Sequence, residues 1–283
     1  MAITSAVYGG GPFYPGSNSV LENLKYTNFS TIVCWAIHVH NNADLYFNNT
    51  LIVSGGKYVG DPSWAQELAN LKDGGSVNRI LFSVGGWGTQ DFYHIADLIK
   101  AHGTAPGSPL FESFAALHST TPAIDGIDMD DEGNYDHHTI VEFTQMLASI
   151  GYREATFCPY MFESFWAGCL QTLQQTNPGF VTAFNLQCYA GGAGNANNLQ
   201  PWIDAVKNVL GPGSDPAEFI VPGLWCKHGA GCSGGMDPQQ IQSLFQHYKT
   251  QGIEGGFIWL YDDIMKCGND PKAYANAIIQ GLS

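Results

Sequence analysis

Basic residues are scarce in this sequence. Lys and Arg together number 11 of 283 residues, against 25 Asp and Glu, which gives a formal net charge of −14 at pH 7. A field of that sign repels a polyanion, so nucleic-acid binding is excluded as the main function. A neutral or cationic ligand is compatible with the charge, and a neutral polysaccharide fits it.

Long apolar runs are also missing. No stretch approaches the roughly 20 residues of a membrane-spanning helix, so we expect no membrane partner. The opening MAITSAVYGGG lacks the basic segment followed by an apolar one that marks a secretory leader. The protein is then either intracellular or secreted with its leader removed, and we expect a secreted monomer.

Metal-ligand spacings are absent as well. None of the seven cysteines forms a CxxC pair, and His38 and His40 share a strand face without a third ligand, so we expect no metal site. Because seven is odd, at least one cysteine lacks an intramolecular disulfide partner. Cys226 and Cys232 flank a glycine-rich segment and are candidates for a local disulfide. Most of the others, Cys34 among them, are expected to be small buried hydrophobes.

Short apolar runs alternate with amphipathic segments along the whole chain. Near-continuous apolar strands separated by helices indicate a buried parallel sheet, and eight such runs predict a single (β/α)8 TIM barrel over residues 1–283. The predicted strands are Ile3–Tyr8, Thr31–His38, Arg79–Val84, Ala123–Met129, Glu154–Cys158, Phe180–Leu186, Glu218–Leu224 and Gly255–Leu260.

Helical patterns fall between these strands, and two begin with Asp-Pro, the order expected of a capped helix start. In such a barrel the active site lies at the C-terminal ends of the strands. The predicted helices are Trp64–Lys72, Asp91–Lys100, Leu110–Leu117, His137–Ile150, Phe165–Gln175, Pro201–Leu210, Pro238–Thr250 and Pro271–Ile279.

The segment DGIDMDDEG, from residue 125 to residue 133, is dense in carboxylates. Side chains alternate along a strand, so Asp128, Asp130 and Glu132 share one face, which points into the barrel. Like charges this close disfavour full ionisation and raise at least one pKa. An acid that keeps its proton near neutral pH is what protonation of a glycosidic oxygen requires.

Two simpler interpretations of this segment compete with catalysis. A solvated acidic turn is disfavoured because the flanking AID and GID are apolar. A calcium loop of the EF-hand type is disfavoured because position twelve is Thr139 rather than Glu, and because a strand, not a helix, precedes the segment.

The segment DGIDMDDE resembles the DGxDxDxE signature of family-18 glycoside hydrolases, which include chitinases and endo-β-N-acetylglucosaminidases. Three further family motifs have counterparts in the same order along the chain. SVGG at 83–86 matches SxGG on the third strand, Gln187-Cys188-Tyr189 looks like the QxY element of the sixth strand, and Trp259 matches the final-strand tryptophan.

The resemblance implies retaining hydrolysis in which the substrate's own 2-acetamido group is the nucleophile. Glu132 is then the acid and base, and Asp130 holds the acetamido N–H. Asp128 shares a proton or hydrogen bond with Asp130, so the pair titrates as a unit. Tyr189 donates its hydroxyl to the acetamido carbonyl, and Trp259 forms the floor under the sugar. No organic cofactor is implied.

Supporting roles follow from the same motifs and from position at strand ends. Ser83 is expected to hydrogen-bond the aspartates, Gly85 and Gly86 to allow close backbone approach, and Asp125 to be a structural residue near the site. Gln187, from the QxY element, is expected to contact an N-acetylglucosamine oligo- or polysaccharide. Other expected contacts, each equally compatible with core packing, are Tyr8, Trp87, Tyr160, Met161, Phe162 and Trp225.

Two departures from the family pattern leave the substrate open. Asp131 stands where chitinases usually carry an aromatic residue, as in some endo-β-N-acetylglucosaminidases that cut N-glycan cores, and Ala190 replaces the usual Asn or Asp. The hypotheses are a chitinase-like hydrolase, an endo-β-N-acetylglucosaminidase and a non-catalytic chitinase-like lectin. The lectin is disfavoured because the acid Glu132 is present. No long insertion precedes the last strand, which predicts an open cleft and endo action.

Overall fold

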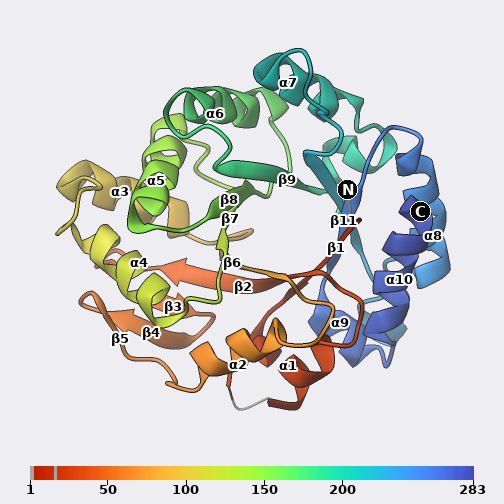
Figure 1. The fold of residues 1–283 in the computed structure, drawn as a ribbon, viewed down its shortest axis with the longest axis horizontal. Helices are drawn as coiled ribbons and strands as arrows, with labels where there is room; N and C mark the ends of the chain where they lie inside the picture. The colour runs from red at the N-terminus through yellow and green to blue at the C-terminus, as the bar shows by residue number, and fades with distance from the viewer. Residues whose placement is uncertain (1–2, 16–17) are drawn as a thin grey trace.

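Eight parallel strands close into a barrel in the computed structural model, which describes residues 3–15 and 18–283. Each strand pairs with its neighbours in chain order, and β1 closes the ring by pairing with both β2 and β11 (Figure 1). The predicted TIM barrel is therefore confirmed. Its strands are β1 (Thr4–Gly9), β2 (Thr31–Val39), β6 (Arg79–Gly85), β7 (Gly126–Asp130), β8 (Glu154–Phe157), β9 (Val181–Gln187), β10 (Ile220–Trp225) and β11 (Gly255–Trp259).

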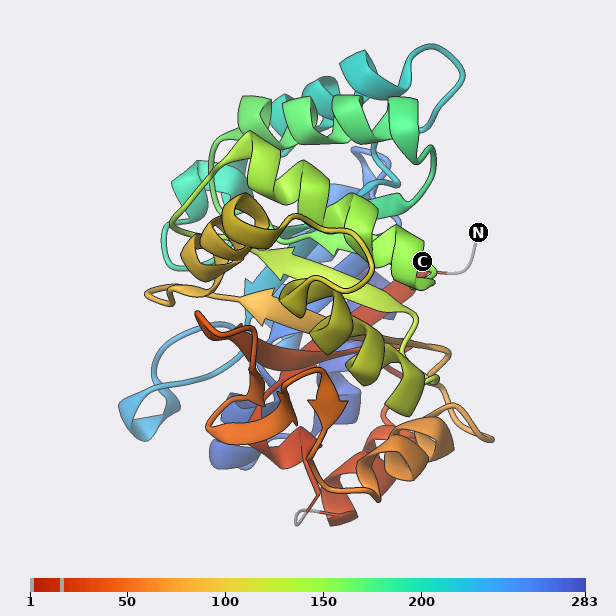
Figure 2. The same cartoon turned by 90° about the vertical axis from the view of Figure 1, so that its left-hand side faces the viewer.

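Helices surround the barrel and cover the outer faces of its strands, as Figure 2 shows from the side. All eight predicted helices are present. They are α2 (Trp64–Leu71), α3 (Asp91–His102), α4 (Pro109–Thr120), α5 (His137–Ile150), α6 (Glu163–Thr176), α7 (Gln200–Leu210), α8 (Pro238–Lys249) and α10 (Pro271–Leu282). The carboxylates of Asp237 and Asp270 accept backbone N–H groups at the starts of α8 and α10, as the Asp-Pro pairs predicted.

Three antiparallel strands that the sequence did not predict extend from β2. They are β3 (Leu45–Phe47), β4 (Thr50–Ser54) and β5 (Lys57–Tyr58), and in Figure 1 they lie outside the ring of central strands, next to α4. The helices α1 (Asn18–Leu24) and α9 (Tyr261–Lys266) were not predicted either.

Two apolar cores result from the alternation of side chains along the strands. The larger core fills the layer between the strands and the helices, and the smaller lies inside the barrel. The inner core is built around Tyr8, Val33, Leu81, Cys158 and Phe257. Each of these residues lies on a different barrel strand or directly after it. The barrel is therefore filled, and only its mouth is open to a ligand.

One disulfide differs from the pairing that the sequence suggested. Cys232 bonds to Cys267 across 35 residues, which ties the loop after β10 to the end of α9. The predicted Cys226–Cys232 pair is wrong because Cys226 turns inward to the core, where burial raises the pKa of its thiol to about 12. Cys34 is buried and free, as expected. Among the described residues, no helix combines the length and apolar character needed to span a bilayer.

Candidate active site

A cavity of about 560 Å³ opens at the C-terminal mouth of the barrel. Its volume lies in the range of small-molecule sites, and most of its wall is aromatic. The lining residues come from seven barrel strands or the loops that follow them: Trp35, Trp87, Glu132, Tyr135, Tyr160, Met161, Gln187, Tyr189, Ala190, Trp225 and Trp259.

The innermost carboxylate of the site is Asp128, which is fully buried on β7. Its Oδ2 atom accepts hydrogen bonds from Tyr8 and Ser83, each at 2.9 Å. Its Oδ1 atom accepts from Thr156 at 2.6 Å and from Asn185 at 2.9 Å. Burial raises the pKa of Asp128, while these four donors favour its charged form and lower that pKa.

Asp130 is the last residue of β7, and Glu132 follows in the loop after it, toward the mouth. Burial and the charges of Glu132 and Asp128 raise the pKa of Asp130 well above its ordinary value. Burial also raises the pKa of Glu132, against hydrogen bonding from Gln187, Asp130 and the Trp87 backbone. Burial therefore makes all three acids retain protons more strongly than free carboxyls do, and Asp128 is the one whose charged form is stabilised by four hydrogen-bond donors.

Gln187, Tyr189 and Trp259 surround this row. Gln187 donates its Nε2–H to Oδ1 of Asp130 at 2.9 Å. The rings of Tyr189 and Trp259 stack with centroids 5.9 Å apart and an interplanar angle of 21°. The cavity thus presents an aromatic floor beside the acids, which suits the apolar face of a sugar ring.

The glycine pair at the end of β6, Gly85 and Gly86, permits close packing at the mouth. Gly85 has φ +102, and a Cβ there would lie 2.4 Å from the backbone oxygen of Asp130. Gly86 has φ +122, and a Cβ there would lie 3.1 Å from the ring of Trp35. Both positions require glycine, for conformation and for space.

Two residues predicted near the substrate, Tyr8 and Asp125, have different surroundings. Tyr8 is fully buried and does not line the cavity, because its hydroxyl is directed to Asp128. Asp125 precedes β7 at the opposite end of the barrel, where it pairs with Lys72 and Arg153, so it is structural but remote from the site. Asp131 is also turned away from the cavity and belongs to the loop after β7.

The carboxylate of Asp131 organises the loop that carries Glu132. It accepts backbone N–H groups from Gly133, Asn134 and Tyr135 at 2.8–3.1 Å and is 2% exposed. Its side chain is therefore committed to the protein backbone. The endo-β-N-acetylglucosaminidase hypothesis, which rests on Asp131, therefore gains no uncommitted carboxylate from it.

The remaining predicted sugar contacts lie around the rim of the cavity. Trp87 is 85% exposed. Tyr160, Met161 and Trp225 are half-buried in the wall of the cavity. Phe162 is exposed but packs edge-on to Tyr135 rather than lining the cavity. Tyr135 and Trp35 were missed by sequence reasoning, although strand alternation places Trp35 on the same face as Val33.

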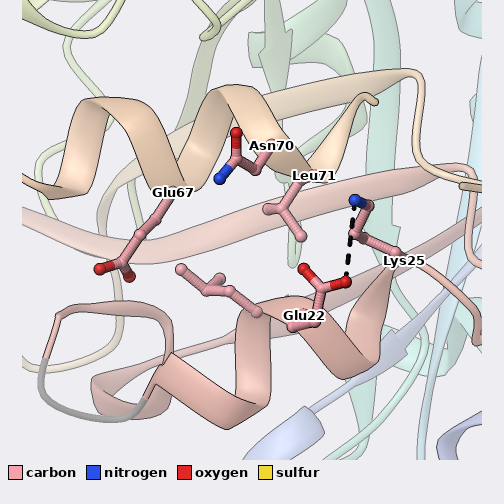
Figure 3. Close-up of a pocket in the computed structure, with 6 residues that line it drawn as sticks. Glu22, Lys25, Glu67, Asn70 and Leu71 are labelled. Carbon is pink, nitrogen blue, oxygen red and sulfur yellow. Dashed lines mark ion pairs between the residues drawn. The ribbon is translucent and has the colours of Figure 1, made fainter. Parts of the chain in front are cut away.

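A second polar pair and a smaller cavity lie away from the mouth of the barrel. His38 binds Asp91 at 2.9 Å, and among the described residues no group of His, Cys, Asp and Glu is arranged to hold a metal ion. A smaller cavity of about 110 Å³ lies between α1 and α2 (Figure 3). It is lined by Leu21, Glu22, Lys25, Glu67, Asn70 and Leu71, none of which lies at the mouth.

No protein-family model and no curated protein matches the sequence. The fold, however, is similar to that of solved family-18 chitinases. A family-18 chitinase from Pseudoalteromonas aurantia has a TM-score of 0.69 at 15% identity, covering 99% of this chain and 100% of that one. The catalytic domain of a hyperthermophilic chitinase from Pyrococcus furiosus has a TM-score of 0.68 at 12% identity, covering 100% and 95%.

A third similar structure is human YKL-39, described as a pseudo-chitinase that retains chitooligosaccharide binding. Its TM-score is 0.63 at 14% identity, with 99% of this chain and 100% of that one covered. The fold that the motifs implied is therefore the fold of family-18 chitinases. The same fold carries both hydrolysis and binding alone, so activity depends on the residues of the site.

Proposed function

We propose that the chain is a chitinase-like glycoside hydrolase that cleaves β-1,4-linked N-acetylglucosamine with retention of configuration. The observation that carries the proposal is the row Asp128, Asp130 and Glu132 beside an aromatic cavity. An acid with a raised pKa, at a sugar-sized cavity, is what protonation of a glycosidic oxygen requires.

In the first step, the 2-acetamido carbonyl oxygen of the substrate attacks the anomeric carbon. The bond to the leaving oxygen breaks, and that oxygen takes the proton of Glu132. In the second step, water attacks the same carbon and gives a proton to Glu132, while the bond to the acetamido oxygen breaks. The carboxylate of Asp130 faces the positive charge of the oxazolinium ion between the two steps.

The measurement that tests this is product formation from N-acetylglucosamine oligomers. Glu132→Gln is nearly isosteric but cannot donate the proton, and we expect it to lower kcat by about a thousandfold or more. Glu22→Gln is the matched control, since it makes the same change beside Lys25, outside the mouth (Figure 3). Equal activity of Glu132→Gln and native protein would refute the proposed role of Glu132.

The alternatives are an endo-β-N-acetylglucosaminidase and a non-catalytic binding protein. Release of an intact N-glycan without cleavage of oligomers would select the first. A second cavity of about 270 Å³ beside Trp87, lined in part by Tyr93, Asp131 and Glu132, would hold the leaving group in that case. Binding of oligomers without any product would select the second, as described for YKL-39.

We further propose endo action by a secreted monomer. The Cys232–Cys267 disulfide supports an extracellular location, because disulfides persist in oxidising compartments. Mid-chain cleavage of long oligomers, release of mixed product lengths and a monomeric mass in solution would bear out the endo action and the monomer.

A further inference from the structure

Trp35 is fixed in the mouth of the barrel from both sides. Its ring packs edge-on to Trp259, with centroids 4.9 Å apart and an interplanar angle of 82°. Its backbone carbonyl accepts a hydrogen bond from Nδ2 of Asn48 at 3.2 Å. The ring lines the cavity, so its orientation is set by packing before any ligand arrives.

The indole N–H of Trp35 is buried and has no hydrogen-bond partner. A buried donor without a partner destabilises the fold, so its retention calls for an explanation. Other tryptophans in the structure satisfy theirs: Trp64 donates to Phe13, Trp166 to Met161, Trp202 to Asn195 and Trp225 to Asp263.

The unpartnered N–H lies beside Asp130. Among the influences on Asp130, Trp35 favours the charged carboxylate, although the two groups do not meet the geometry of a hydrogen bond. Gly86 makes this approach possible, because a Cβ there would lie 3.2 Å from Nε1 of Trp35. Asp130 already accepts one N–H, from Gln187.

We propose that Trp35 is a positioning residue, whose indole N–H donates to the Asp130 carboxylate when that group carries its full negative charge. The carboxylate of Asp128 accepts hydrogen bonds from four side chains. The carboxylate of Asp130 accepts an N–H hydrogen bond from Gln187, and the indole N–H of Trp35 would add a second. When charge develops on Asp130 opposite the oxazolinium ion, a preformed and desolvated donor stabilises it without reorganisation of water. The catalytic role of this contact, though not the contact itself, rests on the proposed function.

The titratable groups that act on Asp130 all become negative when they ionise, so no nearby cation masks the effect of Trp35. They come from β7 and its loop and from three other strands or the residues just after them: Asp128, Glu132, Tyr135, Tyr8, Cys158 and Tyr189.

The test removes the N–H and preserves the ring. Trp35→Phe is the simple variant, and replacement of Trp35 by benzothienylalanine, which has sulfur in place of the N–H, keeps the full size of the side chain. Trp64→Phe is the control, since it removes an indole from the outer core. Titration of Asp130 is followed by NMR with carboxyl-labelled aspartate, and the signal is assigned by its loss in Asp130→Asn.

We expect both Trp35 replacements to raise the apparent pKa of Asp130 by roughly half to one unit, because its charged form loses a donor. The acid limb of the kcat/KM profile moves upward by the same amount, and kcat falls about tenfold with little change in KM. Trp64→Phe lowers the melting temperature and leaves the titration of Asp130 unchanged.

An unchanged titration in both Trp35 replacements overturns the proposal. A rise in KM without a pH shift also overturns it, since the N–H would then serve the sugar directly. The titration does not require turnover. If native protein cleaves no N-acetylglucosamine substrate, the proposed function fails, while the titration still decides whether Trp35 acts on Asp130.

Discussion

The base and the mouth of strand β7 bear the same kind of side chain in opposite electrostatic surroundings. At the base, the carboxylate of Asp125 accepts hydrogen bonds from Nζ of Lys72 at 2.6 Å, from Nη1 of Arg153 at 2.9 Å and from the backbone N–H of Ile80 at 2.8 Å. At the mouth, Asp128, Asp130 and Glu132 form no ion pair with a Lys or Arg of the described chain.

The carboxylate at the base is therefore stabilised by cations, whereas the carboxylates at the mouth are buried without them. A negative charge with cationic partners favours folding, while buried acids with raised pKa values oppose it at neutral pH. The acids at the mouth are therefore maintained at the expense of stability, which is the usual sign of a functional site.

Asp130→Asn is expected to have the largest effect of the substitutions that test this difference between the two ends of β7. We expect kcat to fall by about a hundredfold or more, because the variant lacks the charge that the proposed mechanism places opposite the oxazolinium ion. The same variant is more stable than native protein at pH 7, with a melting temperature higher by roughly 2–4 °C for each kcal/mol gained. Calorimetry and oligomer hydrolysis measure the two changes.

The size of that gain depends on pH. Because the folded pKa of Asp130 is raised, its cost is absent below the unfolded value of about 3.9. The cost grows as pH rises from there toward the folded pKa, since only the unfolded chain releases the proton. The stabilisation by Asp130→Asn should shrink between pH 7 and pH 4, and a constant gain would contradict this account.

The next largest effect is expected at the base of the strand. Asp125→Ala removes both ion pairs and the acceptor for Ile80, so we expect a loss of about 2 kcal/mol in the free energy of unfolding. The exposed fraction of the Arg153 side chain is 70%, so Arg153→Ala should cost under about 1 kcal/mol. Urea denaturation measures both. A severalfold change in kcat/KM for Asp125→Ala would show that the two ends are coupled.

The smallest effect concerns Asp131, which lies among the acids of the mouth but bonds only to backbone. Asp131→Ala frees three N–H groups of the loop, and we expect a loss of about 1 kcal/mol in stability together with a roughly tenfold lower kcat. The pH profile should keep its shape, because Asp131 does not exchange protons with the substrate. A displaced alkaline limb would assign Asp131 to the titrating group instead.

The barrel was predictable because each buried parallel strand is a near-continuous apolar run, such as Arg79–Val84. The antiparallel strands β3–β5 are short, and only turn pairs such as Asn48-Asn49 and Gly55-Gly56 indicate them. Alternation placed Asp128, Asp130 and Glu132 on one face. The surroundings of those acids were not predictable in full.

Contacts between distant segments explain what was missed. The unpartnered N–H of Trp35 depends on a glycine from another strand, and the Cys232–Cys267 pairing depends on α9, which no pattern predicted. Tyr8 illustrates the same point, because its bond to Asp128 joins residues 120 positions apart. Sequence patterns report local period and motif, whereas these contacts are set by how the elements pack.

Closure of the barrel through β1 also has a consequence for biosynthesis. Thr4 pairs with Gly255, about 250 residues later, so a ribosome adding roughly 5–20 residues per second finishes β11 some 12–50 seconds after β1. During that interval β1 and the most recent strand are open edges that can pair with other chains. The nascent polypeptide therefore needs protection until its last strand emerges, and that strand also delivers Trp259.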